Sequence, residues 1–378
     1  MTAAAGGRVV VEGRIVTPGG IVDGRVRVEG DRIAGIEPAA TGSDSVIVPG
    51  FVDLHNHGGG GHTVTDGDPD AVRAAAAFHL RHGTTTLLAS LVSAPPGRLR
   101  AATARLAALV AEGVLAGVHL EGPYLSPARR GAHHAAHLRP PSIRELDELL
   151  EAGAGAVRMV TLAPELPDAM AAVAWLVERG VVVAVGHTDA TYAQTREAVD
   201  TGARVATHLF NAMRPLHHRD PGPVPALLGR PGVVCELVAD GVHLHDAVLA
   251  LAARAAGPTG AALVTDATAA AGMPDGRYEL GGSPVRVEGG VARLVTGDGT
   301  PGALAGSTLT MDAALRQAVR AGVPLVDAVA MAATTPAGLL GLAGTVGALA
   351  PGWRADLVEL DPDLRVRRVM RAGTWVAP

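Results

Sequence analysis

The middle of this sequence alternates short apolar runs with alanine-rich stretches of helical character, and this alternation constrains the fold more than any other feature. Eight apolar runs are strand candidates: FVDLH from residue 51, TTTLLAS from 84, VLAGVHLEG from 114, VRMVTLAP from 157, VVVAVGH from 181, VATHLF from 205, VVCELVAD from 233 and ALVTD from 262. Helical runs lie between them, such as DPDAVRAAAAFHLRHG and PELPDAMAAVAWLVERG. Strands that alternate with helices form a parallel sheet. Eight such units in about 290 residues predict a TIM (β/α)8 barrel, whereas the alternative, a doubly wound sheet, would not need a count of eight.

The two ends of the chain have a different sequence pattern. Residues 8–48 are short β-type runs between glycine-rich turns, and the segment from Thr345 to Pro378 resembles them. We therefore expect both ends to pair into one small β-sandwich domain, made of residues 1–49 and 345–378, beside an α/β barrel over residues 50–344. Hairpin turns are expected in the first part at Gly19-Gly20, Asp23-Gly24 and Gly30-Asp31.

Residues 269–306 interrupt the rhythm of strands and helices. Their sequence, which begins AAAGMPDGRYELGGSPVRVEGG, indicates a β-hairpin inserted after the eighth strand. Loops on that side of a barrel build the active site. The insertion would then be a flap over the site, and the alternative is a surface insertion without a role.

The composition excludes several classes of protein. The chain has 378 residues, a formal net charge of −5 and no lysine, so all 32 basic residues are arginine. The acidic balance argues against a nucleic-acid binder, and the missing lysine excludes a P-loop lysine, a Schiff-base lysine and a carbamylated lysine that bridges two metals. The single cysteine, Cys235, excludes an intrachain disulfide and a cysteine-based zinc site. Without a signal-peptide core or an apolar run of membrane-spanning length, we expect a soluble cytoplasmic protein with no membrane partner.

Histidines and acidic residues gather at the ends of the strand candidates. In a barrel these ends share one rim, so six side chains would converge there: His55, His57, Glu121, His187, His208 and Asp266. In an extended strand the side chains of His55 and His57 face the same way and can reach one metal ion. Each residue alone also has an ordinary interpretation: a polar pair for the two histidines, a helix cap for Glu121, a buried structural histidine for His187 or His208.

Taken together, these residues predict metal chemistry. Two imidazoles and a carboxylate with an open position are the ligand set of catalytic zinc or iron, which acidifies bound water and polarises a carbonyl group. A nearby aspartate such as Asp266 can take the proton of the water and later deliver it to a leaving group. The residues therefore indicate metal-assisted hydrolysis of a C–N or similar bond. Because lysine is absent, any ligand that bridges two metals must be Glu121.

Eight segments resemble the N-acetylglucosamine-6-phosphate deacetylases of the amidohydrolase superfamily: PGFVDLHNHG, HLEGPYLSPARRGAH, VGHTDA, THLFNAM, ADGVHL, VTDAT, GALAGSTLTM and GALAPGWRADLVELD. The resemblance runs in order along essentially the whole chain, from about residue 9 to 376. The resemblance implies that Glu121, His187 and His208 hold the main metal and that Asp266 is the general base and acid at the metal site. Because His55 and His57 are present, it also implies a second metal. The metal would be zinc, with iron, manganese or cobalt as alternatives.

The resemblance also implies a substrate site for an amino-sugar phosphate. His133 is expected to have a catalytic role and, with Ala132, to contact the sugar. Phosphate contacts are expected from Asn211, Ala212, Arg219 and His243, and a further substrate segment comprises Asp240, Gly241, Val242 and His243. Leu304, Ala305 and Gly306 would line the sugar from the flap. In the family the phosphate site is shared across a dimer, which implies a homodimer here. Arg130 stands where many members have lysine, at a position without a catalytic role.

The implied activity is hydrolysis of N-acetyl-D-glucosamine 6-phosphate to D-glucosamine 6-phosphate and acetate. Three alternatives stay open: the 6-phosphate of N-acetylgalactosamine, another amidohydrolase substrate such as a D-amino acid amide or a cyclic amide, and a sugar-phosphate sensor without catalysis. The complete set of Glu121, His187, His208 and Asp266 argues against the sensor, because a sensor has no use for a general base.

Overall fold

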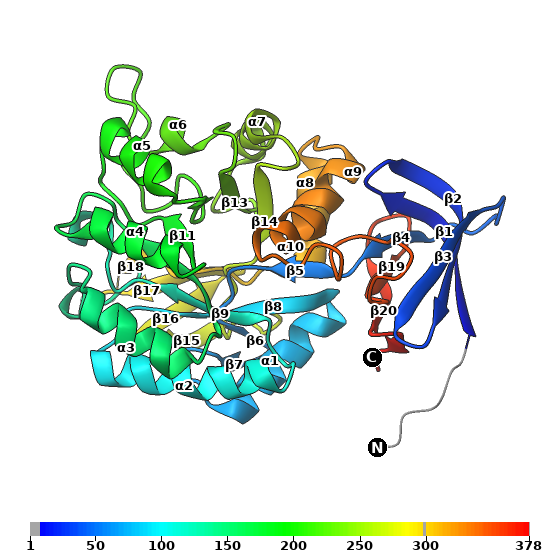
Figure 1. The fold of residues 1–378 in the computed structure, drawn as a ribbon, viewed down its shortest axis with the longest axis horizontal. Coiled ribbons are helices and arrows are strands. Elements are labelled where there is room, and N and C mark those ends of the chain that lie inside the picture. The colour runs from blue at the N-terminus through cyan, green and yellow to red at the C-terminus, as the bar shows by residue number, and fades with distance from the viewer. Residues whose placement is uncertain (1–7, 298–299, 378) are drawn as a thin grey trace.

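The computed structural model describes residues 8–297 and 300–377, and its largest element is an eight-stranded parallel sheet. The strands follow the order β14-β13-β12-β11-β10-β9-β8-β5, so strands that lie side by side are consecutive barrel strands along the chain (Figure 1). Their bounds are β5 Phe51–Asp53, β8 Thr84–Leu91, β9 Gly117–Glu121, β10 Val157–Leu162, β11 Val182–Val185, β12 Val205–Ala206, β13 Val234–Val238 and β14 Ala261–Val264. All eight strand candidates are confirmed, and with them the predicted barrel.

Hydrogen bonds between β5 and β14 close the barrel just beyond the ends of these strands. The carboxylate of Asp53 accepts hydrogen bonds from the backbone N–H of Thr265 at 3.1 Å and from its hydroxyl at 2.6 Å. The backbone N–H of Asp266 donates to the carbonyl oxygen of His55 at 2.9 Å. The first and last strands are therefore held in a fixed register at the rim where the strands end.

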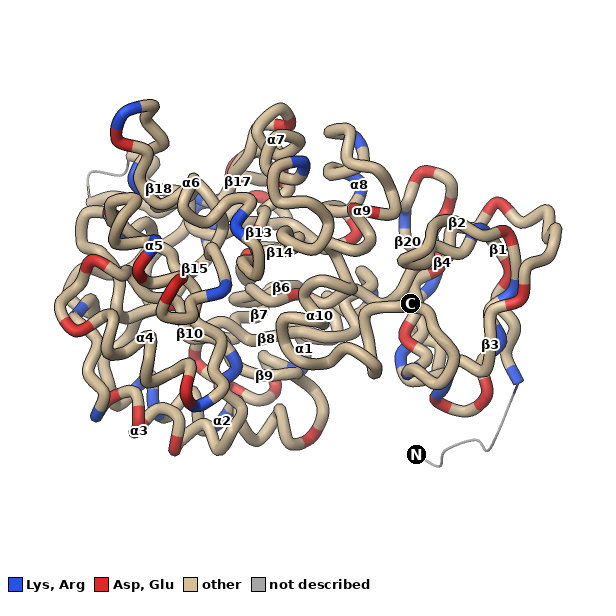
Figure 2. Tube along the Cα trace, turned by 45° about the horizontal axis from the view of Figure 1, so that its top comes forward, with Lys and Arg blue, Asp and Glu red and all other residues tan. Residues whose placement is uncertain are grey.

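Helices cover the outside of the barrel. Their bounds are α1 Pro69–Arg81, α2 Pro96–Ala111, α3 Ile143–Gly153, α4 Ala169–Glu178, α5 Tyr192–Thr201, α6 Val224–Leu227, α7 Asp246–Ala256, α8 Met311–Arg320, α9 Leu325–Val329 and α10 Thr335–Leu339, with a π-helical turn at Ala330–Thr334 between the last two. The strands are buried on both faces, which explains their nearly continuous apolar sequence. Figure 2 shows acidic and basic residues interspersed over the outer helices and loops. None of the helices in the described ranges combines the length and the apolar character that a membrane span needs.

Strands from the two ends of the chain join in one seven-stranded sheet beside the barrel (Figure 1). Its order is β21-β20-β19-β4-β1-β2-β3, and the antiparallel pair of β4 and β19 connects the two ends. The bounds are β1 Arg8–Thr17, β2 Gly20–Glu29, β3 Arg32–Pro38, β4 Val46–Pro49, β19 Leu357–Leu360, β20 Val366–Arg371 and β21 Thr374–Trp375. The edge strand β3 turns back onto the C-terminal half, because Ile33 exchanges backbone hydrogen bonds with residues 352 and 353. The predicted pairing of the two ends is confirmed.

Two predicted turns in the first segment need correction. The Asp23-Gly24 turn is wrong, because both residues lie inside β2, where Gly24 pairs with Gly13. A Cβ on Gly24 would lie 2.4 Å from the carbonyl oxygen of Glu37, so glycine serves close strand approach here rather than a turn. The first turn lies at Pro18-Gly19, one residue before the predicted position, and the Gly30-Asp31 turn is confirmed.

The insertion after β14 is larger than the predicted hairpin. It forms a four-stranded antiparallel sheet of β15 Gly276–Leu280, β16 Ser283–Glu288, β17 Val291–Val295 and β18 Pro301–Leu304. Glycine pairs at 281–282 and 289–290, all with positive φ, allow the two tight turns. Two short strands, β6 Gly58–Gly59 and β7 His62–Thr63, form a further small hairpin after β5.

Candidate metal centre and substrate pocket

The six rim residues predicted from the sequence meet above the barrel. Glu121 is the last residue of β9, and the other five follow the ends of β5, β11, β12 and β14. None of the six is more than 6% exposed. The expectation that strand ends gather these side chains in one place is met by His55, His57, Glu121, His187, His208 and Asp266.

Three of these residues have an unusual backbone conformation. His187, His208 and Asp266 have φ values of 47°, 29° and 48°, in the left-handed region that residues with a Cβ rarely adopt. Each lies where a strand ends and the chain turns over the rim. Strained conformations of this kind persist where the surrounding structure requires a defined side-chain direction, and they concentrate at functional sites.

Glu121 is the centre of the first group of donor atoms. Its Oε1 lies 3.0 Å from the Nε2 of His187 and 3.0 Å from the Nε2 of His208, and these two nitrogens are 3.1 Å apart. Its Oε2 lies 3.3 Å from the Nε2 of His133. One carboxylate thus gathers three imidazoles that come from different parts of the barrel rim.

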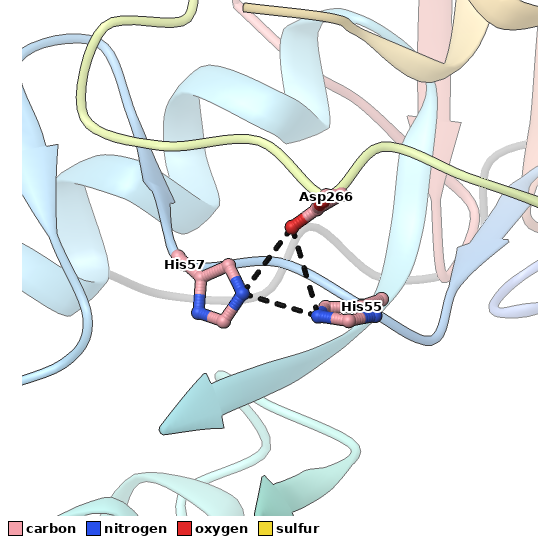
Figure 3. A group of neighbouring side chains, drawn as sticks. All are labelled: His55, His57 and Asp266. Carbon is pink, nitrogen blue, oxygen red and sulfur yellow. Dashed lines mark hydrogen bonds and ion pairs between the residues drawn. The ribbon is translucent and has the colours of Figure 1, made fainter. Parts of the chain in front are cut away.

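His55, His57 and Asp266 form the second group (Figure 3). The Nε2 atoms of the two histidines are 3.1 Å apart. Oδ1 of Asp266 lies 3.3 Å from Nε2 of His57 and 3.6 Å from Nε2 of His55. Glu121 also faces this group, with Oε2 3.3 Å from His57 Nε2. The two groups therefore share Glu121, the residue expected to bridge.

The outer nitrogens of His57 and His187 indicate that this donor set fits a divalent cation. His57 Nδ1 donates to the carbonyl oxygen of Ser90 at 3.0 Å, and His187 Nδ1 donates to that of Arg129 at 2.9 Å. Because these Nδ1 atoms carry a proton, Nε2 is the nitrogen of each ring that can offer a lone pair to a cation at the centre. Burial lowers the pKa of His57, but Asp266 and Glu121 outweigh it and raise that pKa to about 9, so this cluster of Nε2 atoms and carboxylates attracts a cation.

Burial and neighbouring charges set the ionisation of the centre. Burial lowers the pKa of His187 to about 4 although Glu121 opposes this, so the ring is neutral at pH 7. Burial alone would raise the pKa of Glu121, but the rings of His55 and His133 outweigh it and hold that pKa well below its usual range. Burial also opposes ionisation of Asp266, and the neighbouring histidines again lower its pKa below the ordinary value. Neutral imidazole and ionised carboxylate are the forms that bind metals.

A pocket of about 340 Å³ opens directly above these groups. Strands β15 to β18 form part of its wall through Leu280, Gly281, Ser283, Ala303 and Leu304. The insertion therefore belongs to the pocket and is not a surface feature without a role. The loop after β9 supplies a further part of the wall, which includes Arg129, Gly131, Ala132, His133 and His134.

Most of the predicted substrate residues line this pocket: Ala132, His133, Asn211, Ala212, His243, Leu304 and Gly306. Ala305 is fully buried behind the wall, and Gly241 and Val242 lie in an exposed turn. Asp240 supports His243, since its carboxylate accepts from the ring Nδ1 at 2.7 Å and from the backbone N–H at 2.7 Å. Burial opposes protonation of His243, but Asp240 outweighs it and raises the pKa of the ring.

Arg219 lies outside the pocket of its own chain. It is exposed on the loop between β12 and α6, and its backbone N–H donates to Nδ1 of His217 at 3.3 Å. Among the described residues, Arg129 is the only arginine that lines the pocket. The structure of one chain thus separates the predicted phosphate arginine from the other predicted phosphate residues.

Two residues that contact the rim histidines were not identified from the sequence. Glu236 lies in β13, is fully buried, and faces Nδ1 of His55 at 3.0 Å. A glutamate inside the apolar run VVCELVAD is a signal that could have identified it, because an ionised side chain is costly in a core unless it is paired. Arg129 was also overlooked, since its role depends on its carbonyl oxygen next to His187, a contact that no local pattern encodes.

Known proteins resemble this chain along almost its whole length. The model of the Amidohydrolase family matches residues 46–376. The N-acetylgalactosamine-6-phosphate deacetylase of Escherichia coli O157:H7 is 40% identical over 370 residues, which cover 95% of this chain and 97% of the relative. The N-acetylglucosamine-6-phosphate deacetylase of Vibrio furnissii is 37% identical over 335 residues, 87% of this chain and 81% of the relative.

A solved structure extends the similarity to three dimensions. A variant of the N-acetyl-D-glucosamine-6-phosphate deacetylase of Mycobacterium smegmatis, in complex with N-acetyl-D-glucosamine 6-phosphate, has a TM-score of 0.94 and 44% identity to this chain. The match covers 99% of this chain and 100% of that one. The barrel, the terminal sheet and the pocket wall described above all fall within it.

Proposed function

Because this chain belongs to the amidohydrolase family, we propose that it is a metal-dependent deacetylase that hydrolyses N-acetyl-D-glucosamine 6-phosphate to D-glucosamine 6-phosphate and acetate. The observation that carries this function is the buried donor set around Glu121, which opens onto a pocket large enough for a sugar. The whole-chain match to an enzyme bound to this sugar phosphate supports the choice of substrate.

We assign the main metal site to Glu121, His187 and His208, and a second site to His55 and His57, with Glu121 between them and Asp266 beside both histidines. A divalent ion held there supplies Lewis acidity toward the acetyl oxygen and toward a water molecule. Zinc is our first choice, because neutral imidazole and carboxylate suit it, and iron, manganese and cobalt also accept such ligands.

Asp266 moves the proton in this mechanism. It is ionised at neutral pH and lies at the base of the pocket, so it can accept a proton from the attacking water as the new carbon–oxygen bond forms. When the carbon–nitrogen bond breaks, the same carboxyl group returns that proton to the amine nitrogen. One residue thus serves as base and then as acid, and its charge is restored at the end of the cycle.

His133 orients the acetyl group. Its Nδ1 accepts from the backbone N–H of Ser93 at 3.2 Å, so Nε2 carries a proton, and this nitrogen faces Glu121 and the pocket. An N–H placed there can donate to the acetyl oxygen, where negative charge develops during attack. Ala132, Leu304 and Gly306 provide the sugar-contacting walls, with Ala305 behind them.

Asn211, Ala212 and His243 form the phosphate end of the site in our proposal, with the segment from Asp240 through Gly241 and Val242 as the support of His243. A dianionic phosphate favours a guanidinium as well. Because Arg219 is exposed on its own chain, we propose a homodimer in which Arg219 of the partner subunit completes the site. We also place the enzyme in the cytoplasm, since sugar phosphates are charged metabolites that cells retain.

Acetate release from a small substrate panel tests the proposal. The zinc-loaded protein would be assayed with the 6-phosphates of N-acetylglucosamine and N-acetylgalactosamine and with both free sugars. We expect the highest kcat/KM for N-acetylglucosamine 6-phosphate and loss of activity after removal of the metal. A preference for the galactosamine epimer would transfer the function to that substrate, and equal rates on free and phosphorylated sugars would overturn the phosphate site.

A further inference from the structure

Glu236 is a buried carboxylate that the proposed reaction does not use. It lies in the middle of β13, whose other residues are Val234, Cys235, Leu237 and Val238, and it is 0% exposed. Apolar residues would fill this place in the barrel without the cost of burying an ionised group. A carboxylate here therefore needs partners, and the structure provides two.

Both partners belong to the metal centre. One carboxylate oxygen of Glu236, Oε2, lies 3.0 Å from Nδ1 of His55 and accepts from the backbone N–H of His208 at 3.1 Å. The other oxygen, Oε1, is buried and has no hydrogen-bond partner among the described residues. Glu236 thus contacts one residue from each of the two donor groups, and it does so from beneath the rim.

The contact with His55 determines which nitrogen of that ring faces the centre. A carboxylate accepts only, so the ring donates from Nδ1 and presents its Nε2 toward Nε2 of His57, 3.1 Å away. A carboxylate partner also makes the metal-binding nitrogen more basic. His57 has only the neutral carbonyl oxygen of Ser90 in the equivalent place, so the two histidines are oriented by different groups.

Three buried carboxylates surround the imidazoles of the centre. Glu121, Asp266 and Glu236 are three carboxylates, each 6% exposed or less, within one cluster of imidazoles. A divalent ion brings positive charge to these buried carboxylates and so offsets part of the cost of burying them. Glu236 contributes one of the three without occupying a ligand position.

We propose that Glu236 is a positioning residue that enables His55 and His57 to hold a second divalent ion. The inference rests on the proposed metal-dependent function and extends it to one residue that touches neither substrate nor reacting atoms. It predicts that the two metal equivalents depend on Glu236 to different degrees. The first, on Glu121, His187 and His208, should survive changes at position 236, and the second should not.

Zinc counting on the purified full-length protein tests the proposal. The wild type, Glu236→Gln and Glu236→Leu would be loaded with zinc, passed over a chelating resin and assayed for zinc per subunit and for zinc transfer to a chromophoric chelator. Thr103→Val is the control, because Thr103 is a fully buried polar residue of α2 whose hydroxyl donates to the carbonyl oxygen of Leu99 at 2.8 Å. Thermal unfolding would be measured for each protein.

We expect two equivalents in the wild type and in Thr103→Val. Glu236→Gln should keep the first and bind the second about 10- to 100-fold more weakly, as is typical when the partner of a ligand histidine is altered. Glu236→Leu should lose the second equivalent, and partial recovery by glutamine would support positioning rather than packing.

Three outcomes would overturn the proposal. In the first, both variants bind two zinc ions as tightly as the wild type. In the second, Glu236→Leu loses both equivalents together with its thermal stability while Glu236→Gln behaves as the wild type, which would make the residue structural. In the third, the wild type itself holds one ion and is active, a result that leaves the proposed function intact. An active wild type that holds no metal would overturn both the positioning role of Glu236 and the proposed function.

Discussion

The backbone N–H of Asp266 donates to the carbonyl oxygen of His55 over 2.9 Å, and this contact joins the last strand of the barrel to the first. It lies next to the Asp53–Thr265 hydrogen bonds that close the same seam. The side chains of His55 and Asp266 are consequently held 3.6 Å apart between Nε2 and Oδ1. Closure of the barrel and assembly of one half of the metal centre are therefore the same structural event.

Replacement of His187 by alanine should remove metal and activity together. His187 contributes one of the two imidazoles beside Glu121, and its ring is neutral at pH 7 and held by the Arg129 carbonyl oxygen. Zinc content and acetate release would be measured on the same preparation. A His187→Ala protein with full zinc content would show that the ligand assignment is wrong.

Replacement of Asp266 by asparagine should separate binding from catalysis. An amide has nearly the shape of the carboxylate but cannot accept the proton of the attacking water, so kcat should fall about 10²- to 10⁴-fold while KM stays close to the wild-type value. Steady-state kinetics measure both. Near-normal kcat would remove Asp266 from the proton transfer, and zinc analysis would check that the metal is retained.

Replacement of Arg219 by alanine should act on the phosphate alone. We expect a strong rise in KM for the phosphorylated sugar, so that its kcat/KM falls roughly 30-fold to several thousand-fold. The kcat/KM for the free sugar should hardly change. Arg144→Ala is a suitable control, because the side chain of Arg144 is 89% exposed on α3, away from the pocket.

Mixed dimers test whether Arg219 acts across subunits. If it does, Arg219→Ala and Asp266→Asn subunits should restore activity when they are mixed, because one site of the mixed dimer then has both residues intact. Size measurements in solution would establish that dimers form. The absence of any complementation in dimers that exchange subunits would place Arg219 outside the partner's site.

The stability of the fold should depend on pH through Asp312. This buried carboxylate in α8 contacts His82 at the end of α1 at 3.1 Å and Arg316 at 2.7 Å. Burial opposes its ionisation, but His82, Thr310 and Arg316 outweigh that effect and lower its pKa below the ordinary value. The stabilisation is therefore present above the unfolded pKa of about 4 and is lost as the pH falls through the lower folded pKa.

Urea unfolding of Asp312→Asn measures this effect. At pH 7 the variant should be less stable than the wild type by about 3 kcal/mol, the cost of breaking a buried ion pair. The difference should shrink as the pH decreases below about 4. A difference that is constant between pH 7 and pH 3 would indicate that packing, and not charge, stabilises this contact.

The sequence by itself determined the number of barrel strands and most of the metal centre. Both follow from local patterns, because an apolar run that ends in a polar residue marks the place where a buried strand reaches the rim. Glu121, His187, His208 and Asp266 could be identified in this way. Local patterns were less reliable at glycine, and Gly24 was misread because a turn and a close strand approach both require a residue without a side chain.

Only the tertiary structure decided which of these residues touch. The pairing of Glu236 with His55 and the seam between Asp53 and Thr265 join residues from distant parts of the chain, so they depend on strand register and barrel closure. The exposed position of Arg219 likewise depends on how its loop leaves the barrel. Local propensity acts over a few neighbouring residues, whereas side-chain contacts across a closed sheet exist only once every strand has taken its place.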